Sequence, residues 1–574
     1  MRTPSAALRA LAMLTLVALV GCSTSKGSGD DSLAQQTASK ERLSVAPMGD
    51  KVLGYAIVPD LERSASTAHT LLTRFDPGAP PLLPELLEEV RNAMGWQSVD
   101  GLATNKPIKV LVVVNDAESM PEVIALVPIK GEAAFKAQLQ QAEEQVAGNA
   151  LSYETFASPT GRLYVNFIND QAVLTWGPES FAVWKGAIDA MAGARASEGD
   201  LVIGFEATNL MRIYGEQFRV QMAQMKELMN TSMGMTGMPM AEATAQNAQA
   251  MFSLIERFSE DTDRGEIIVS LDPDLVSLQA VARMKEGSVV RRFLDAQPVG
   301  DMSGVDGLPA NPGMAMIASI DFDAADGAFK EVANKFMSGL FPKELTETAE
   351  FAATLNDLFT HLEPGMTSST PIDGGFPFAS GFVQSFNVSD PKAYRESFLK
   401  LSTYYGREDV KAQLLKTYGM TITFQPDVYQ LDGVPVDRTL IAYDFSAMEP
   451  GMGEFMTQMG MGKPMQFDLI CKEKRCIQVQ DPADPRARLT NMLKGGQKAT
   501  PDTDPVKVAL ARALDKPLFF MFFSYEGIGN MLGSLGLPLG NPLAMFAEGQ
   551  GLDASINGQG GHFDFKLNVP LKMR

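Results

Sequence analysis

Residues 123–136 read V-I-A-L-V-P-I-K-G-E-A-A-F-K, in which an apolar strand, a turn and the start of a helix follow one another. Residues 382–395, F-V-Q-S-F-N-V-S-D-P-K-A-Y-R, repeat this order of elements. The aromatic residue of the helix also recurs, because Tyr394 stands where the first stretch has Phe135. The sequence therefore predicts that one structural unit occurs twice in this chain.

Four further pairs of segments occur in the same order in both parts of the chain. They are a strand with an Asp-capped helix (52–58 with Asp60, 314–320 with Asp321 or Asp323), a strand with a proline-led helix (173–191 with Pro178, 476–493 with Pro482), an apolar strand entering a helix (200–210, 517–528) and a closing hairpin (267–281, 552–569). We therefore predict an internal duplication, with halves at residues 48–298 and 299–574 that join in a segment rich in turn residues.

Hairpins beside helices predict an α+β fold in which each half has a mainly antiparallel sheet with helices packed on one face. In its tandem order of β and α units, the body resembles uncharacterised exported bacterial proteins. That resemblance rests on no diagnostic motif and implies no activity. The first half is also expected to contain a Met-rich helical hairpin, and the second half a hairpin that carries a disulfide.

The disulfide is expected in the stretch L-I-C-K-E-K-R-C-I-Q-V, residues 469–479, where two apolar runs flank a charged centre. A four-residue loop, Lys472 to Arg475, places Cys471 and Cys476 opposite one another across a hairpin. In an oxidising compartment such a pair forms a local crosslink. A redox-active pair is the less favoured alternative, because no neighbouring feature lowers the pKa of either thiol.

The N-terminal residues indicate export. Arg2 and Arg9 precede a short apolar run that ends in L-V-G-C, with Cys22 as the last letter. This pattern resembles the signal peptide and lipobox of bacterial lipoproteins. The resemblance implies cleavage after residue 21 and lipidation of Cys22, and Ser23 implies sorting to the outer membrane. The alternative is a plain secretory peptide with an unmodified cysteine.

Residues 22–47 comprise the lipidated cysteine and a polar tether that is rich in serine and glycine. The whole chain has a net charge of −20, and loss of the two N-terminal arginines makes the mature charge −22. A surface with this charge repels nucleic acid, so we expect no nucleic-acid partner. At 574 residues, the chain is long enough for more than one domain.

Metal and catalytic motifs find little support. The three histidines, His69, His361 and His562, lie far apart in the sequence and are expected at the surface. The sequence contains no nucleophile elbow, no zinc-protease motif and no phosphate-binding loop. The segment D-F-D-A-A-D-G at residues 321–327 departs from a calcium loop and reads as a helix cap. We therefore assign no catalytic residue, no metal ligand and no cofactor.

Methionine is clustered in two places. The clusters are Met222, Met225, Met229, Met233, Met235, Met238 and Met240 in the first half, and Met448, Met452, Met456, Met459, Met461 and Met465 in the second. Flexible methionines fill gaps in a helical hairpin, form adaptable surfaces for lipid or protein, or, least favoured here, bind Cu(I). The sequence leaves these alternatives open.

These observations favour an outer-membrane-anchored lipoprotein that faces the periplasm or the cell surface and has a non-catalytic binding or scaffolding role. The membrane is its partner through Cys22, and a protein partner or an apolar ligand remains to be identified. One alternative is a carrier of an acyl chain or another apolar ligand, and a second is an enzyme of unrecognised class.

Overall fold

The structure is a computed structural model of the 574-residue chain. It describes residues 43, 45, 48–116, 119–139, 143–144, 150–155, 157–158, 161–194, 199–236, 252–302, 304–305, 308, 311–321, 348–372, 381–447, 464–481, 483–494, 504–534, 546 and 549–573. The predicted signal peptide at 1–21 and Cys22 lie outside the described residues, as does the tether apart from Leu43 and Val45.

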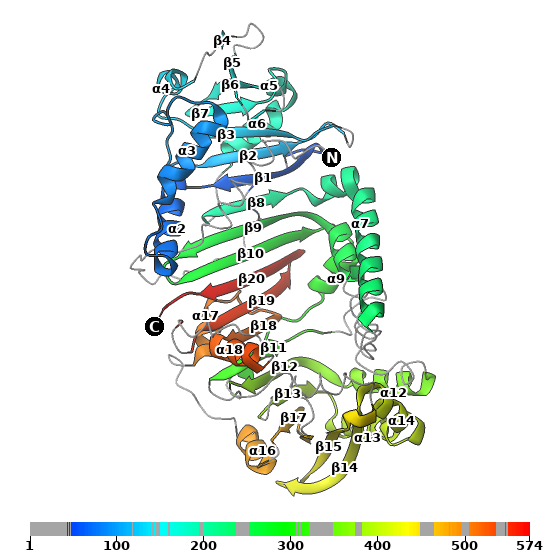
Figure 1. Ribbon diagram of the computed structural model, residues 1–574. Helices are drawn as coiled ribbons and strands as arrows, with labels where there is room; N and C mark the ends of the chain where they lie inside the picture. The colour runs from blue at the N-terminus through cyan, green and yellow to red at the C-terminus, as the bar shows by residue number, and fades with distance from the viewer. Residues whose placement is uncertain are drawn as a thin grey trace. The chain divides into compact units, whose positions relative to one another are not determined.

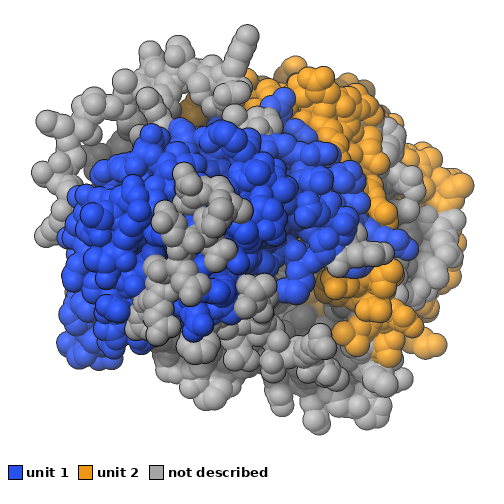
Figure 2. Space-filling view, turned by 90° about the horizontal axis from the view of Figure 1, so that it is seen from above, with its two compact units in different colours: residues 1–218, 262–283, 569–572 blue, residues 219–261, 284–568, 573–574 orange. Residues whose placement is uncertain are grey.

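The chain divides into two compact units, which Figure 2 shows in two colours. Unit 1 comprises residues 1–218, 262–283 and 569–572, and unit 2 comprises residues 219–261, 284–568 and 573–574. These units do not coincide with the ranges 48–298 and 299–574. Residues 219–261 belong to unit 2 because they contact its other parts; for example, Phe258 packs edge-on against Phe563, with ring centroids 4.9 Å apart.

The strands of unit 1 pair in the order β4-β5-β6-β7-β3-β2-β1-β8-β9-β10, and all pairs from β4 to β9 are antiparallel (Figure 1). Its strands are β1 (Val52–Val58), β2 (Ile108–Val113), β3 (Glu122–Pro128), β4 (Glu143–Glu144), β5 (Leu151–Glu154), β6 (Arg162–Ile168), β7 (Gln171–Thr175), β8 (Leu201–Phe205), β9 (Thr262–Asp272) and β10 (Leu275–Met284).

Helices cover both faces of this sheet. They are α2 (Leu61–Phe75), α3 (Leu82–Met94), α4 (Glu132–Ala137), α5 (Ser180–Val183), α6 (Lys185–Gly193) and the first part of α7 (Ala207–Thr236). In β3, Ile124 and Leu126 pack with the core cluster that contains α6. Ala125 and Val127 alternate with them and pack with the cluster that contains α3 and α4.

The sheet of unit 2 is also antiparallel, in the order β14-β15-β16-β17-β13-β12-β11-β18-β19-β20 (Figure 1). Its strands are β11 (Pro312–Ala318), β12 (Leu362–Pro371), β13 (Val383–Val388), β14 (Met420–Leu431), β15 (Val434–Tyr443), β16 (Met465–Lys472), β17 (Arg475–Gln480), β18 (Phe519–Ser524), β19 (Gly551–Gln559) and β20 (His562–Pro570).

Helices of unit 2 also lie on both faces of its sheet. They are α9 (Val289–Asp295), α12 (Ala349–Thr360), α13 (Pro391–Tyr405), α14 (Glu408–Tyr418), the short 3₁₀ helix η2 (Phe445–Ala447), α16 (Pro485–Leu493), α17 (Pro505–Arg512) and α18 (Tyr525–Ser534). Leu469 of β16 packs with α12, α13 and α14, whereas its neighbour Ile470 packs with α16. The prediction of helices on one face is therefore wrong, because alternate residues of the central strands are apolar and both sets need a cover.

Local sequence sets where several helices begin. The side chain of Asp390 accepts hydrogen bonds from the backbone N–H groups of Lys392 and Ala393, and Pro391 is the first residue of α13. An aspartate followed by proline begins α16 and α17 in the same way, at Asp484 and Asp504. Proline suits the first position of a helix because a backbone N–H at that position has no acceptor within the helix, so its absence costs no hydrogen bond. The helix expected after Pro482 thus begins at Pro485.

The overall class agrees with the α+β prediction, because each unit combines a large antiparallel sheet with packed helices. The apolar strand at residues 519–524 is β18, which pairs with β11 on one side and β19 on the other. It is thus a central strand. Within the described residues, no helix combines the length and the apolar character that crossing a bilayer requires.

Candidate functional site

The hairpin of β16 and β17 carries the disulfide. Cys471 and Cys476 are partners in the strand register, their Cα atoms are 4.0 Å apart, and their sulfurs are bonded. Only Glu473 and Lys474 form the turn, which makes it two residues shorter than the loop expected from sequence. Glu473 takes a left-handed φ of 57°. Cys476 is fully buried and both cysteines pack with the α12–α14 cluster, so the bond lies at the edge of a core.

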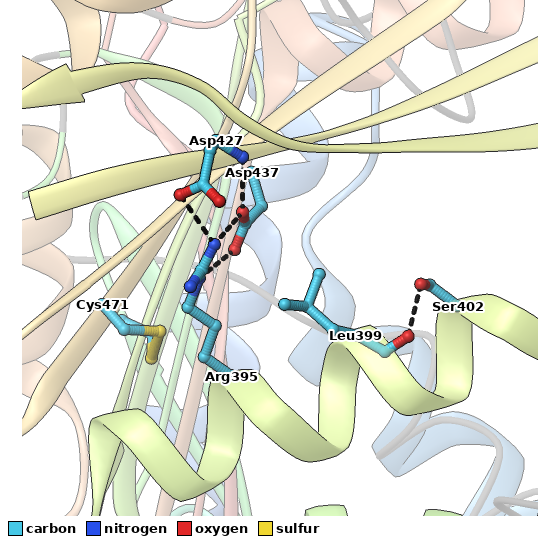
Figure 3. A network of polar contacts seen from close by, with 7 residues as sticks. Arg395, Leu399, Ser402, Asp427, Asp437 and Cys471 are labelled. Atoms are coloured by element: carbon cyan, nitrogen blue, oxygen red, sulfur yellow. Dashed lines mark hydrogen bonds and ion pairs between the residues drawn. A yellow bond between two sulfur atoms is a disulfide. The ribbon is translucent and has the colours of Figure 1, made fainter.

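An arginine and two aspartates join α13 to the long hairpin of β14 and β15 (Figure 3). Arg395 donates from Nε and Nη2 to the two oxygens of Asp437, each at 2.6 Å, and Nη2 also reaches Asp427 at 3.1 Å. The Asp427 backbone N–H donates to Asp437 as well, at 3.1 Å. The bond to Asp437 is the main cause that raises the pKa of Arg395. Both oxygens of Asp437 therefore accept hydrogen bonds, and the network holds a helix against a strand.

A second buried carboxylate, Asp468, lies on the other face of the same strands. Arg438 donates to its two oxygens at 2.7 and 2.8 Å, and the Tyr429 hydroxyl donates at 2.7 Å. Arg486 of α16 stacks over the Tyr429 ring at 4.7 Å from its centroid. Burial, helped by the carboxylate, raises the pKa of Tyr429 above its ordinary value. This cluster holds α16 against the sheet and leaves no free base.

A third charged cluster closes the C-terminal end of α17. Arg512 is the last residue of the helix and binds Asp553 of β19 with Nε at 2.5 Å. Lys566 and Asn568 of β20 donate to the Arg512 carbonyl oxygen at 2.8 and 3.3 Å. Burial raises the pKa of Asp553 and lowers the pKa of Lys566. Opposed shifts are typical of functional sites, but here the geometry of a helix cap accounts for them.

The histidines do not form a site. Each is half-buried, so their expected exposure holds only in part. The Nδ1 atom of His69 on α2 is buried and has no hydrogen-bond partner among the described residues, and His361 follows the last residue of α12. The Nδ1 atom of His562 lies 3.1 Å from the Gly560 carbonyl oxygen. Across the described part of the chain, no group of three or more His, Cys, Asp or Glu side chains is placed to hold a metal ion.

The Met-rich region of the first half contains a pair of antiparallel helices in unit 2. We call residues 219–236 of α7 together with the helical residues 252–261 the helix pair. Lys226 binds Glu256 at 2.7 Å and Arg219 lies 3.7 Å from Glu260, which sets the two helices antiparallel. The expected helical hairpin is therefore present in its two arms, and residues 237–251 lie outside the described residues.

The helix pair has apolar side chains on two sides. Met222 is buried, at 4% exposure, and serves packing. Four other large apolar side chains have exposures of 44–70%: Val220, Met225, Leu228 and Ile255. An exposed set of this kind marks an interaction surface rather than a core. Sequence reasoning had singled out Met225 but not the other three, because the helical period alone does not say which face a partner element covers.

Other expected sites fall outside the described residues. These are Cys22, Met238, Met240, Asp323, Met448, Met452, Met456, Met459 and Met461. Met465 begins β16 and is buried, so this methionine of the second cluster serves packing.

Sequence reasoning also missed the buried acids Asp437, Asp468 and Asp553. A signal was present, because each is an acidic residue inside a strand pattern otherwise rich in apolar residues.

Comparison with protein-family models, curated proteins and solved structures finds no match to this chain.

Proposed function

We propose that this chain is an exported, lipid-anchored protein with a non-catalytic binding or scaffolding role. The L-V-G-C sequence ending at Cys22 supports the anchor, and the Cys471–Cys476 disulfide suits an oxidising compartment. Ser23, by resemblance, favours the outer membrane. The three buried aspartates of unit 2 support a non-catalytic role, since each one binds partners that attach a helix to the sheet.

The helix pair is the contact surface in this proposal. The observation that carries it is the exposure of Val220, Met225, Leu228 and Ile255 on neighbouring helices. Large apolar side chains in water are unfavourable at about 25 cal/mol for each Å² left exposed, so an adjacent set favours a partner that covers it. Methionine in such a set adapts to partners of different shape. We infer that the partner is the apolar face of another exported protein.

Site-specific photocrosslinking in cells tests this surface. A photoreactive amino acid replaces Leu228, the most exposed of the four at 70%, in the full chain with Cys22 intact. The matched control places the same group at Glu89, an exposed residue of α3 in unit 1. We expect a discrete protein adduct at residue 228 that is absent at residue 89 and is lost when Met225 and Ile255 are changed to glutamine. Equal adducts at the two positions, or none at 228, would contradict the proposal.

The anchor has its own test. Wild-type protein should pellet with membranes and require detergent for release, whereas a Cys22→Ser variant should appear as unmodified protein in the soluble fraction or remain uncleaved. The thioether lipid adds about 0.8 kcal/mol of membrane affinity for each buried CH₂ group, which makes the difference large. Unchanged membrane attachment of a Cys22→Ser protein that has lost residues 1–21 would contradict lipidation at this residue, whereas an uncleaved precursor remains attached through its apolar signal sequence.

We also propose that the two units are copies of one ancestral unit. Adding ten to each strand number of the unit 1 order reproduces the unit 2 order, from β4–β14 to β10–β20. The irregularities correspond as well, because the register shifts between Val52 and Gly54 in β1 and between Pro312 and Met314 in β11. Both sheets use a two-residue turn before β7 or β17, and Asn169 and Glu473 begin these turns with φ of 57°.

Strand registers make this correspondence specific to single residues. Tyr55 is the register partner of Leu111 in the β1–β2 pair, and Ala315 is the register partner of Ser369 in the β11–β12 pair. Tyr55 therefore corresponds to Ala315 and Leu111 to Ser369, and the same comparison extends to the next strands of each sheet. Fold similarity by chance does not preserve an irregularity, a turn and the register between them, so common descent is the simpler explanation of the match.

A further inference from the structure

Arg475 in unit 2 is a half-buried cation that has no carboxylate partner among the described residues. It lies on β17, and its Nε donates to the hydroxyl oxygen of Ser385 on β13 at 2.5 Å. Its two terminal nitrogens have no hydrogen bond or ion pair to any residue that the structure describes. Burial lowers its pKa from the ordinary arginine value, and no carboxylate offsets that effect. By contrast, Arg395 and Arg438 each bind a buried aspartate with two nitrogens.

Two serine hydroxyls lie on the same face of the sheet as Arg475. Ser385 is 4% exposed and accepts the Arg475 N–H through its oxygen, which leaves its own O–H available to donate. Ser369 is 1% exposed, and its hydroxyl has no hydrogen-bond partner in the part of the chain that the structure describes. Ser385 pairs with Thr367 on β12, and Ser369 is two residues further along that strand. The two serines are therefore diagonal neighbours, roughly 7–8 Å apart.

The polarity of these positions is not required by the fold. If the two units are copies, as proposed above, the strand registers match Ser369 with Leu111 and Thr367 with Lys109. Lys109 is the register partner of Leu126, and Thr367 is the register partner of Ser385. Because Thr367 corresponds to Lys109, Ser385 corresponds to Leu126. Leu111 and Leu126 are fully buried beneath α6 in an apolar cluster. Unit 1 thus builds the same part of the sheet from leucine.

The position of Arg475 follows from the same registers. Leu126 is the register partner of Val173 on β7, and Ser385 is the register partner of Ile477 on β17, so Val173 corresponds to Ile477. Gln171 lies two residues before Val173, and Arg475 lies two residues before Ile477, so these two residues also correspond. Unit 2 therefore has an arginine and two buried serines where unit 1 has a glutamine and two buried leucines. Burying a polar group without a partner is unfavourable, and this applies to the Ser369 hydroxyl and to the terminal nitrogens of Arg475. The three changes lie along one diagonal of the sheet with Ser385 in the middle, and they favour a ligand that supplies the missing acceptor.

We propose that Arg475, Ser385 and Ser369 form an oxyanion-binding site that holds the carboxylate or phosphate group of a ligand. The guanidinium supplies two free N–H edges in a planar fork, a geometry that matches both groups. The Ser385 and Ser369 hydroxyls supply further donors from the sheet. These three side chains provide donors and a positive charge without a competing carboxylate. The net charge of the chain is −20, so general attraction of anions does not account for binding here.

Calorimetric titration of the full mature chain, carrying Cys22→Ser for solubility, tests the site. The probes are inorganic phosphate and sodium hexanoate, titrated separately at low ionic strength and neutral pH. We expect saturable binding of at least one probe. The tighter probe identifies the chemical class, because phosphate represents a phosphate-bearing ligand and hexanoate a carboxylate with an apolar tail.

Matched variants separate the site from general electrostatics. Arg475→Gln, which installs the residue of unit 1, should weaken binding by about tenfold or more, because a charge-assisted pair of hydrogen bonds is lost. Lys474→Gln removes the same charge from the adjacent, exposed turn position and should change affinity by less than about twofold. Equal losses in the two variants, or the absence of saturable binding in the wild type, would overturn the proposal.

A second variant guards against misfolding. Ser385→Ala keeps Arg475 and removes one donor, and it should also weaken binding while the unfolding temperature without probe stays within a few degrees of wild type. Bound anion should raise the unfolding temperature of the wild type more than that of Ser385→Ala, because a ligand stabilises only the state that binds it. Identical shifts in both proteins would count against the site.

Discussion

The ring of Tyr55 lies directly over Gly204, so closely that a β-carbon on the glycine would come within 2.0 Å of the ring carbon Cζ. The two residues are partners across the β1–β8 pair. The Tyr55 hydroxyl donates to Glu266, which is fully buried, so moving the ring aside would break a buried hydrogen bond. In unit 2 the corresponding partners are Ala315 and Phe522, so the large residue stands on the other strand.

Gly204→Ala should therefore destabilise unit 1 by about 3 kcal/mol, because an overpacked core must shift side chains or backbone. All three tryptophans of the chain, Trp96, Trp176 and Trp184, belong to unit 1, so urea unfolding followed by tryptophan fluorescence reports on this unit. Gly186→Ala, at a position with open space around the added carbon, serves as the control. A Gly204→Ala protein as stable as this control would contradict the close contact.

Asp468→Ala should cost about 3 kcal/mol or more, because it leaves Arg438 half-buried without its partner. Hydrogen exchange of the β14, β15 and β16 amides measures this loss locally. Asp189→Ala breaks an exposed pair with Lys185 and should cost less than about 0.5 kcal/mol. Similar protection of these amides in the wild type and Asp468→Ala would show that the buried pair is energetically neutral.

Reduction of the Cys471–Cys476 bond should lower the free energy of unfolding by about 2 kcal/mol at most, since the bond closes a very short loop. Urea unfolding with and without reductant measures the effect. A variant with Cys471→Ala and Cys476→Ala is the control and should not respond to reductant. A much larger loss in the wild type would indicate that the bond maintains more of unit 2 than its own hairpin.

The cap of α13 should make stability depend on pH. Hydrogen bonds from the backbone N–H of Ala393 and then Lys392 lower the pKa of Asp390 below its ordinary value. A lowered folded-state pKa adds stability above the unfolded-state pKa of about 3.9, and this stability is lost as the pH falls through the folded-state value. The difference in urea midpoint between wild type and Asp390→Ala should be greatest near neutral pH and shrink below about pH 4. A difference that does not change with pH would contradict this account.

Much of the local structure could be predicted because it depends on neighbouring residues. Asp60 caps α2, as expected, by accepting the backbone N–H of Arg63 at 2.8 Å. The strands of the closing hairpins lie at 262–284 and 551–570, around the segments that their alternating side chains indicated. Turn length was harder to predict, because Lys472 and Arg475 are charged yet continue the strands. Charge at a strand end does not prevent backbone pairing.

The expected single helical layer failed for a different reason. Period-two patterns identify an apolar face only when the other face is polar, and β16 has apolar residues on both faces, such as Leu469 and Ile470. Likewise, sequence could not reveal that Arg475 has no acidic partner among the residues that the structure describes. The nearest acids in sequence, Glu473 and Asp481, lie elsewhere on the hairpin, and Ser385 is brought to Arg475 only by strand pairing.

By itself, the sequence determined the α+β class, the positions of most strands and helix starts, and the placement of two cysteines across one hairpin. These features depend on side-chain alternation, capping and turn residues that lie within a few positions of one another. Only the tertiary structure decided which faces are covered, that Val220 and Leu228 stand exposed, and that Arg475 meets buried serines. These properties depend on which distant segments become neighbours, and the strand registers that bring them together are fixed by packing over the whole of each sheet.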